Sequence, residues 1–128
     1  MTHLEIAHSL RNGEKVYNCG QTLVMTYSKE LGMTKEDAMN AGRFFGAGML
    51  HGGTCGTISA AMLILGKLNA SPQDASRIVN EFKESHKSTQ CCELLKMSRE
   101  NGISKKVHCD GLIYEMIEKI DECIKNAD

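Results

Sequence analysis

The sequence has no tryptophan, a single proline and a net charge of −1, and its only aromatic residues are three tyrosines and three phenylalanines. Proteins that bind nucleic acid usually carry clustered lysines and arginines, often with aromatic side chains for base stacking. Neither feature is seen here, so nucleic acid is not expected as a partner. Long apolar runs are also missing, since the longest, Ala60 to Leu65, is far too short to cross a bilayer. We therefore expect no membrane insertion.

Several short motifs of known chemistry are missing as well. The chain has no Cys-x-x-Cys pair, which speaks against a thioredoxin-type site or a zinc ribbon, and no Cys-x-x-Cys-His segment to attach a c-type haem. The glycine-rich stretch Gly46 to Gly53 does not end in Gly-Lys-Ser/Thr, so a nucleotide-binding P-loop is not expected. The first residues include Glu5 and no apolar secretion signal, which predicts a cytoplasmic protein.

Helical spacing of apolar residues dominates the chain. β-branched residues never form long alternating runs, and the single proline, Pro72, follows Ser71 in a strong helix start. With 128 residues and no linker, the chain predicts one domain over residues 1–128. The expected fold is all-α, a single compact bundle of about five to seven helices. A polar loop is expected at residues 98–106, with helices over roughly 4–10, 18–31, 34–45, 55–68, 71–86, 88–95 and 108–125.

Cysteine, in contrast, is plentiful, with six residues. In a cytoplasmic chain that can fold without disulfides, cysteines are more often metal-binding or redox-active than structural. At a helix start, unpaired backbone N–H groups and the helix dipole stabilise a thiolate and lower the pKa of the thiol. Thiolate is both the nucleophile of disulfide exchange and the form that ligates metals. Cys19, Cys55, Cys91 and Cys109 lie at predicted helix starts, whereas Cys92 and Cys123 are interpreted as a reserve thiol and a core cysteine.

The residues around Cys55 add candidates for cofactor binding. The glycines before it allow positive φ angles or a close approach of the backbone. The N–H groups of Gly53 and Gly56 are candidates for a nest that donates hydrogen bonds to a thiolate or to a cluster sulfur. His51, four residues before Cys55, and His108, next to Cys109, are candidate ligands or proton donors, although a surface position suits each of them too.

Four segments carry a recognisable pattern: Tyr17-Asn18-Cys19-Gly20-Gln21, Cys55-Gly56-Thr57-Ile58-Ser59-Ala60, Cys91-Cys92-Glu93-Leu94-Leu95 and Cys109 ahead of a helix. In order and context they resemble the C-GCAxxG-C-C family of redox-active proteins, over roughly Leu10 to Ile120. The resemblance implies a small helical domain in which these four segments supply the signature thiols. Related domains accompany split-Soret-type cytochromes, which implies an iron–sulfur or other cysteine-ligated centre. The family's Cys-Gly-Ala-x-x-Gly motif is altered here at Thr57 and Ala60, which puts tight helix packing on that face in doubt.

Three functions stay open from the sequence. In the first, a cytoplasmic thiol oxidoreductase exchanges disulfides with an unidentified redox partner, with Cys19 and Cys55 as the better pair and Cys91 and Cys109 as a second pair. In the second, the same four thiols ligate one metal centre in an electron carrier or sensor. A [2Fe–2S] cluster is the preferred centre and zinc is the second choice. In the third, the chain is a non-catalytic helical module with inert thiols. A homodimer that completes the site is compatible with all three.

Overall fold

The computed structural model describes residues 1–126. This part of the chain forms seven α-helices and one short π-type turn, η1, which confirms the expectation of an all-α bundle. The elements in chain order are α1 (His3–Arg11), α2 (Cys19–Thr26), α3 (Lys35–Ala41), η1 (Gly48–Gly52), α4 (Gly56–Lys67), α5 (Pro72–His86), α6 (Cys91–Glu100) and α7 (Lys105–Asn126).

Side chains at the helix starts explain where most of these helices begin. The side chains of Thr2, Asn18, Thr34 and Ser71 each accept a hydrogen bond from a backbone N–H in the first turn, a group that would otherwise lack a partner. At Thr2 and Asn18 the third helical residue bonds back to the cap and completes a capping box. Pro72 occupies the first turn of α5, where its missing N–H is not needed.

Two helix starts differ from the prediction. The Ser104 side chain accepts a hydrogen bond from the N–H of Val107, so α7 begins at Lys105 and the expected polar loop is shortened. Ser88 does not cap α6, because its hydroxyl accepts from the N–H of Gln90 and bonds Glu93, and Gln90 itself precedes the helix. As a result Cys91 is the first residue of α6, whereas Cys109 lies one turn inside α7 rather than at its start.

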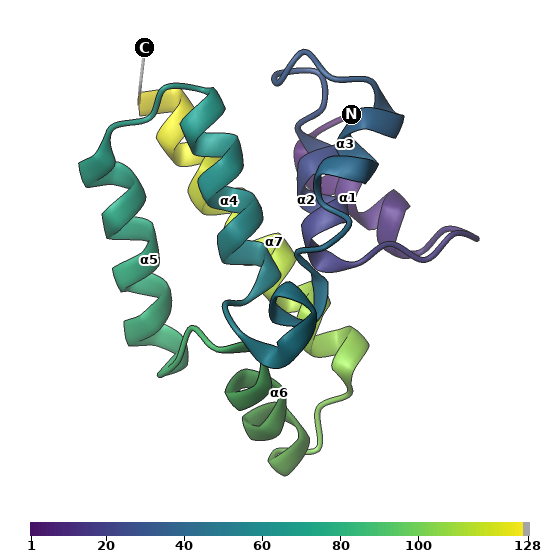
Figure 1. The fold of residues 1–128 in the computed structure, drawn as a ribbon, viewed down its shortest axis with the longest axis vertical. Coiled ribbons are helices and arrows are strands. Elements are labelled where there is room, and N and C mark those ends of the chain that lie inside the picture. The colour runs from purple at the N-terminus through teal and green to yellow at the C-terminus, as the bar shows by residue number, and fades with distance from the viewer. Residues whose placement is uncertain (127–128) are drawn as a thin grey trace.

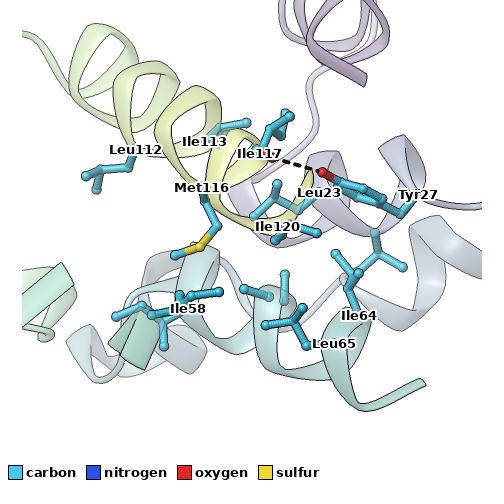
Figure 2. Packing of buried hydrophobic residues seen from close by; sticks show 14 of the residues in the cluster. Leu23, Tyr27, Ile58, Ile64, Leu65, Leu112, Ile113, Met116, Ile117 and Ile120 are labelled. Carbon is cyan, nitrogen blue, oxygen red and sulfur yellow. Dashed lines mark hydrogen bonds between the residues drawn. The ribbon is translucent and has the colours of Figure 1, made fainter. Parts of the chain in front are cut away.

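The hydrophobic core lies where α2, α4 and α7 pack against one another. Figure 1 shows α4 and α7 through the middle of the molecule, α5 on one side, α1 to α3 on the other, and α6 beyond the end where α7 begins. Each helix contributes apolar side chains at helical spacing, which is the pattern that predicted the helices. The largest contributors, many of them drawn in Figure 2, include Leu23, Ile58, Ile64, Leu65, Ile113, Met116, Ile117 and Ile120.

A buried polar contact joins the C-terminal end of α2 to α7. Tyr27 is fully buried, and its hydroxyl donates to a carboxylate oxygen of Asp121 at 2.7 Å. The same hydroxyl lies 3.3 Å from the carbonyl oxygen of Ile117, the contact drawn dashed in Figure 2. His3 in α1 also bonds Asp121, so three helices meet at one carboxylate. In the described residues, no helix is both long and apolar enough to cross a membrane.

Candidate thiol site

The four cysteines singled out in the sequence line one cavity of about 760 Å³. Cys19 comes from α2, Cys55 directly precedes α4, Cys91 opens α6 and Cys109 lies in α7. Cys55 is buried and the other three are half-buried. Four helices that are distant in the sequence thus bring their thiols to one place, and all four sulfurs are free thiols in the described chain.

A short stretch of paired backbone brings Cys55 and Cys91 together. Thr54 and Gln90 form an isolated antiparallel bridge. The N–H of Cys55 donates to the carbonyl of Thr89 at 2.8 Å, and the N–H of Cys91 donates to the carbonyl of Gly53 at 2.6 Å. These bonds satisfy the donors at the starts of α4 and α6, and they fix the two cysteines beside each other.

Cys19 approaches this pair because the chain has glycine at position 56. A Cβ atom added to Gly56 would lie 2.4 Å from the Sγ of Cys19 and 2.7 Å from the carbonyl oxygen of Phe45. Any side chain at this position would therefore push the thiol or the backbone away. The start of α2 is held in turn by the Asn18 side chain, which accepts from the N–H of Gln21 at 2.8 Å and donates to the carbonyl of Arg43 at 2.9 Å.

A left-handed turn precedes Cys55. Residues 47–50 all have positive φ angles, between 53° and 70°, although only one of them is glycine. Each non-glycine residue in this region costs about 1–2 kcal/mol. Gly48 cannot be replaced easily, because a Cβ there would lie 2.5 Å from the backbone of Gly53 and 2.8 Å from the Cβ of Cys91. The strained turn sets the position of Gly53, whose carbonyl holds Cys91, and it places Ala47 in the cavity wall.

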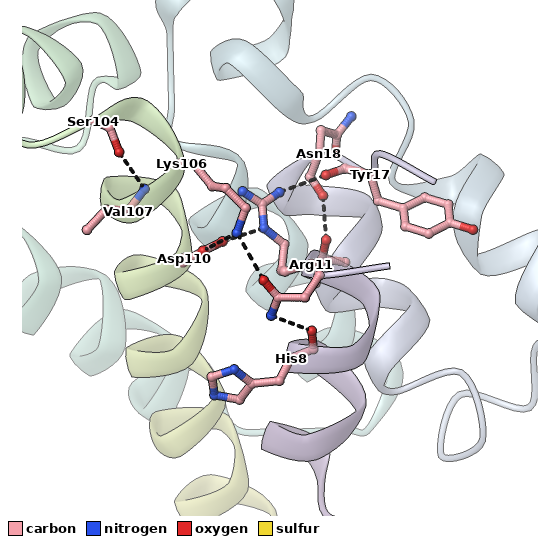
Figure 3. Close-up of polar contacts among 10 residues, drawn as sticks. His8, Arg11, Tyr17, Asn18, Ser104, Lys106, Val107 and Asp110 are labelled. Carbon is pink, nitrogen blue, oxygen red and sulfur yellow. Dashed lines mark hydrogen bonds and ion pairs between the residues drawn. The ribbon is translucent and has the colours of Figure 1, made fainter. Parts of the chain in front are cut away.

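Ionic contacts close the side of the cavity next to Cys109. Arg11, the last residue of α1, pairs with Asp110 at 2.5 Å and donates to the carbonyl of Tyr17 at 2.7 Å. Lys106 pairs with the other carboxylate oxygen of Asp110 at 2.8 Å. Figure 3 shows both cations directed at this one carboxylate. The contacts join α1, the following loop and α7 beside the thiols.

Burial raises the pKa of the half-buried thiols. The pKa of Cys19 is raised to about 12, first by burial and then by charge repulsion from the other three cysteines at the cavity. The N–H of Gly20, at the start of α2, lowers this pKa, but by less than burial and the other cysteines raise it. Burial destabilises the thiolate of Cys19 more than the N–H groups at the helix start stabilise it. The expected lowering of the pKa is therefore wrong for Cys19.

The same balance acts on Cys91 and Cys109, whose pKa values are also raised, mainly by burial. Here nearby cations oppose the shift. Lys105 lowers the pKa of both thiols, and Arg11 lowers that of Cys109. These cations line the same cavity as the thiols, so their positive charge partly offsets the effect of burial.

Thr57, one of the two departures from the family motif, makes a direct contact with the site. It is fully buried, lines the cavity, and its hydroxyl is hydrogen-bonded to the Sγ of Cys55 at 3.1 Å. Ala60, the other departure, is also fully buried. The expected loosening of helix packing on this face is not seen at either position.

The other residues singled out in the sequence have different positions. The ring of His51 lies on Gly53, but His51 is exposed and does not line the cavity. Gly53 and Gly56 contribute a backbone contact to Cys91 and a close approach to Cys19, as described above. Cys92 is exposed and Cys123 is buried in the core of α7, so neither joins the four thiols.

The sequence did not point to the cations at the cavity. Arg11, Lys15, Lys105 and Lys106 all line it, yet they come from two segments at opposite ends of the chain. The net charge is −1 and the sequence has no basic run, so a cluster of cations could not be predicted from it. The Lys105-Lys106 pair was its only local signal, and adjacent lysines are common on protein surfaces.

The thiols suit some metal centres better than others. Within residues 1–126, no three His, Cys, Asp or Glu side chains are grouped so as to hold a metal ion. A single zinc ion, which needs four ligands at about 2.0–2.3 Å, therefore does not fit the described site. An iron–sulfur cluster spreads four thiolates over more than one iron, and the site offers that number and type of donor around a cavity.

Comparisons with known proteins agree with the pattern of cysteines. A family model described as "Putative redox-active protein (C_GCAxxG_C_C)" matches residues 17–123, most of the chain and all six cysteines. Searches of curated proteins and of solved structures gave no match. With four thiols gathered at one cavity and the family model matched over this length, the chain belongs to the C_GCAxxG_C_C family of redox-active proteins.

Proposed function

We propose that the protein is an electron carrier or redox sensor in which Cys19, Cys55, Cys91 and Cys109 ligate one iron–sulfur cluster of the [2Fe–2S] type. The observation that carries the proposal is the convergence of these thiols, from four helices, on a single cavity. Such a cluster takes four cysteine ligands. A cytoplasmic location accompanies the proposal, because free thiols persist in that compartment.

The raised pKa values favour metal ligation over disulfide exchange. Disulfide exchange needs a thiolate near neutral pH, and the raised pKa values keep Cys19, Cys91 and Cys109 protonated there. Iron binding displaces these protons, and its positive charge removes the repulsion among the four thiolates. Thiols that stay protonated in the absence of metal are therefore better suited to hold a cationic centre, which displaces their protons, than to attack a disulfide.

The residues of the chain have separate tasks in this proposal. The paired backbone at Thr54 and Gln90 fixes two ligands, and the missing side chain at Gly56 leaves room for Cys19. The Thr57 hydroxyl can donate to the sulfur of Cys55 once that sulfur is a thiolate, which lowers the electron density on it. When bound, the cluster supplies one-electron transfer.

The test is anaerobic reconstitution of the purified full chain with ferric iron and sulfide. We expect about two iron and two acid-labile sulfide per chain, visible charge-transfer bands, and an electron paramagnetic resonance signal after one-electron reduction. A reconstituted protein that stays colourless and iron-free would refute the proposal. Zinc bound in place of iron, with no cluster formed after zinc removal, would refute it as well.

A dithiol site is the second candidate, and the contact between Cys19 and Gly56 favours it. The Sγ of Cys19 stands against Gly56, the residue that follows Cys55, so Cys19 and Cys55 are close neighbours in the fold. Two thiols would lose two protons and two electrons as the S–S bond forms, and a disulfide on a partner would accept them and become two thiols. A reversible Cys19–Cys55 disulfide in metal-free protein, found by alkylation and mass spectrometry together with failed reconstitution, would support this candidate.

A further inference from the structure

We infer that the cavity beside the four thiols binds a small organic anion with an apolar body. The inference rests on the proposed function only in that it assigns the substrate class of the same redox site. It depends on three features of the cavity, which are its size, its apolar wall and the sign of the charges around it.

The cavity is larger than the thiol site alone requires. Its volume of about 760 Å³ falls within the 300–1,000 Å³ typical of pockets for organic ligands. A [2Fe–2S] core has only four atoms, so most of this space would remain open beside it. The wall includes many apolar side chains, which suit a hydrocarbon or ring system: Val16, Tyr17, Ala47, Leu94, Leu95 and Leu112.

The charged side chains that line the cavity are all cations. They are Arg11, Lys15, Lys105 and Lys106, and no Asp or Glu of the described chain lines the wall. Arg11 and Lys106 both pair with the single carboxylate of Asp110. These three side chains together therefore carry a net charge of about +1. Figure 3 shows the side chains of Arg11 and Lys106 both directed at Asp110.

Two of the four cations have no acidic partner. Neither Lys15 nor Lys105 forms an ion pair with any described residue, and both are exposed. Glu14 is next to Lys15 in the chain but does not line the cavity. A carboxylate or phosphate group on a ligand would supply the missing charge, and a concave, mostly apolar wall would hold the rest of the molecule.

The position of Lys105 connects the anion site to the thiols. Lys105 lines the same cavity as Cys91 and Cys109. An anion bound to Lys105 would therefore lie next to the redox centre, where an electron acceptor or donor has to be. A concave site of this size fits a small molecule better than the flat acidic face of a protein, since protein partners bury broad surfaces.

The probe for this inference is 8-anilinonaphthalene-1-sulfonate, an anion whose fluorescence rises in apolar sites. Its control is N-phenyl-1-naphthylamine, which has the same rings and no charge. We expect the anion to bind the native chain at least about tenfold more tightly than the neutral amine, because only the anion meets the lysines. The double substitution Lys15→Glu and Lys105→Glu should weaken the anion about tenfold or more and leave the neutral amine unchanged.

The matched control is Lys29→Glu with Lys35→Glu, which changes the net charge equally, away from the cavity wall. Equal binding of anion and amine, or equal loss of anion binding in both double variants, would overturn the inference. So would a failure of the native chain to bind the anion. Iron content is measured on the same samples, so anion binding to a chain that takes up no iron would refute the proposed function and leave the inference standing.

Discussion

Replacing Gly56 by alanine tests the packing on which the thiol site depends. The added Cβ would lie 2.4 Å from the Sγ of Cys19 and 2.7 Å from the carbonyl oxygen of Phe45. The thiol can rotate, but the carbonyl belongs to the backbone and can move only with its helix or turn. The substitution should therefore displace Cys19 and strain the start of α4.

The size of the effect follows from two opposed contributions. Overpacking of a dense site costs about 1–3 kcal/mol, and alanine in a helix gains up to about 1 kcal/mol over glycine. The gain is smaller at Gly56, the first residue of α4. We expect a net loss of about 1–2 kcal/mol of unfolding free energy, which lowers the melting temperature by about 4–8 °C in a domain of this size.

Gly66→Ala in the same helix is the control. Gly66 is exposed and a Cβ there meets nothing within 4 Å, so this substitution should stabilise the protein by about 0.5–1 kcal/mol. Thermal and urea unfolding of the metal-free variants measure both effects. If Gly56→Ala proves as stable as Gly66→Ala, Cys19 does not pack against α4 as described, and the reasoning about the site is wrong.

Three further predictions concern the thiols and the strained turn. Because the folded pKa of Cys19, about 12, lies above its unfolded value of about 8.5–9, its contribution to stability is full below about pH 8.5 and is lost as the pH rises towards 12. Urea unfolding of the metal-free chain from about pH 9 to 11 should show a loss about 1 kcal/mol per pH unit steeper in the wild type than in Cys19→Ala; parallel curves would contradict the burial of this thiol. Cys92 is the one exposed cysteine among the described residues, so Cys92→Ser should remove the fastest phase of reaction with a thiol reagent, and an unchanged fast phase would be contrary to the structure. Leu50→Gly should stabilise the protein by up to about 1 kcal/mol by relieving a φ of 70°, whereas the similarly exposed Val107→Gly in α7 should destabilise it by about 0.5–1 kcal/mol, and equal shifts in melting temperature would refute the left-handed turn.

The helices could be predicted because their signals are local. Asn18, Thr34 and Ser71 each cap the helix that their sequence context predicted. The start of α7 was missed because Ser104 is one of several polar residues in a stretch typical of a loop, and nothing there marks it as the cap. That difference of about one helical turn moved Cys109 from a helix start to a helix interior.

The site could be predicted only in part. The context of the cysteines singled out the four thiols that line the cavity, but the direction of their pKa shifts depends on burial, which is a property of the assembled fold. The cations at the cavity depend on the meeting of α1 with α7. The left-handed turn at residues 47–50 was hidden too, because Met49 and Leu50 are poor choices for positive φ angles and only the glycines around them hinted at a special conformation.

The central claim, that four particular thiols form one redox centre, is tested most directly by iron stoichiometry across six variants. Each cysteine is changed to serine in turn, and iron and sulfide per chain are measured after anaerobic reconstitution, with circular dichroism to verify folding. We expect folded variants of Cys19, Cys55, Cys91 and Cys109 to lose the native iron content and visible spectrum. Variants of Cys92 and Cys123 should keep both. Full iron in any of the first four variants, or its loss in Cys92→Ser, would contradict the account.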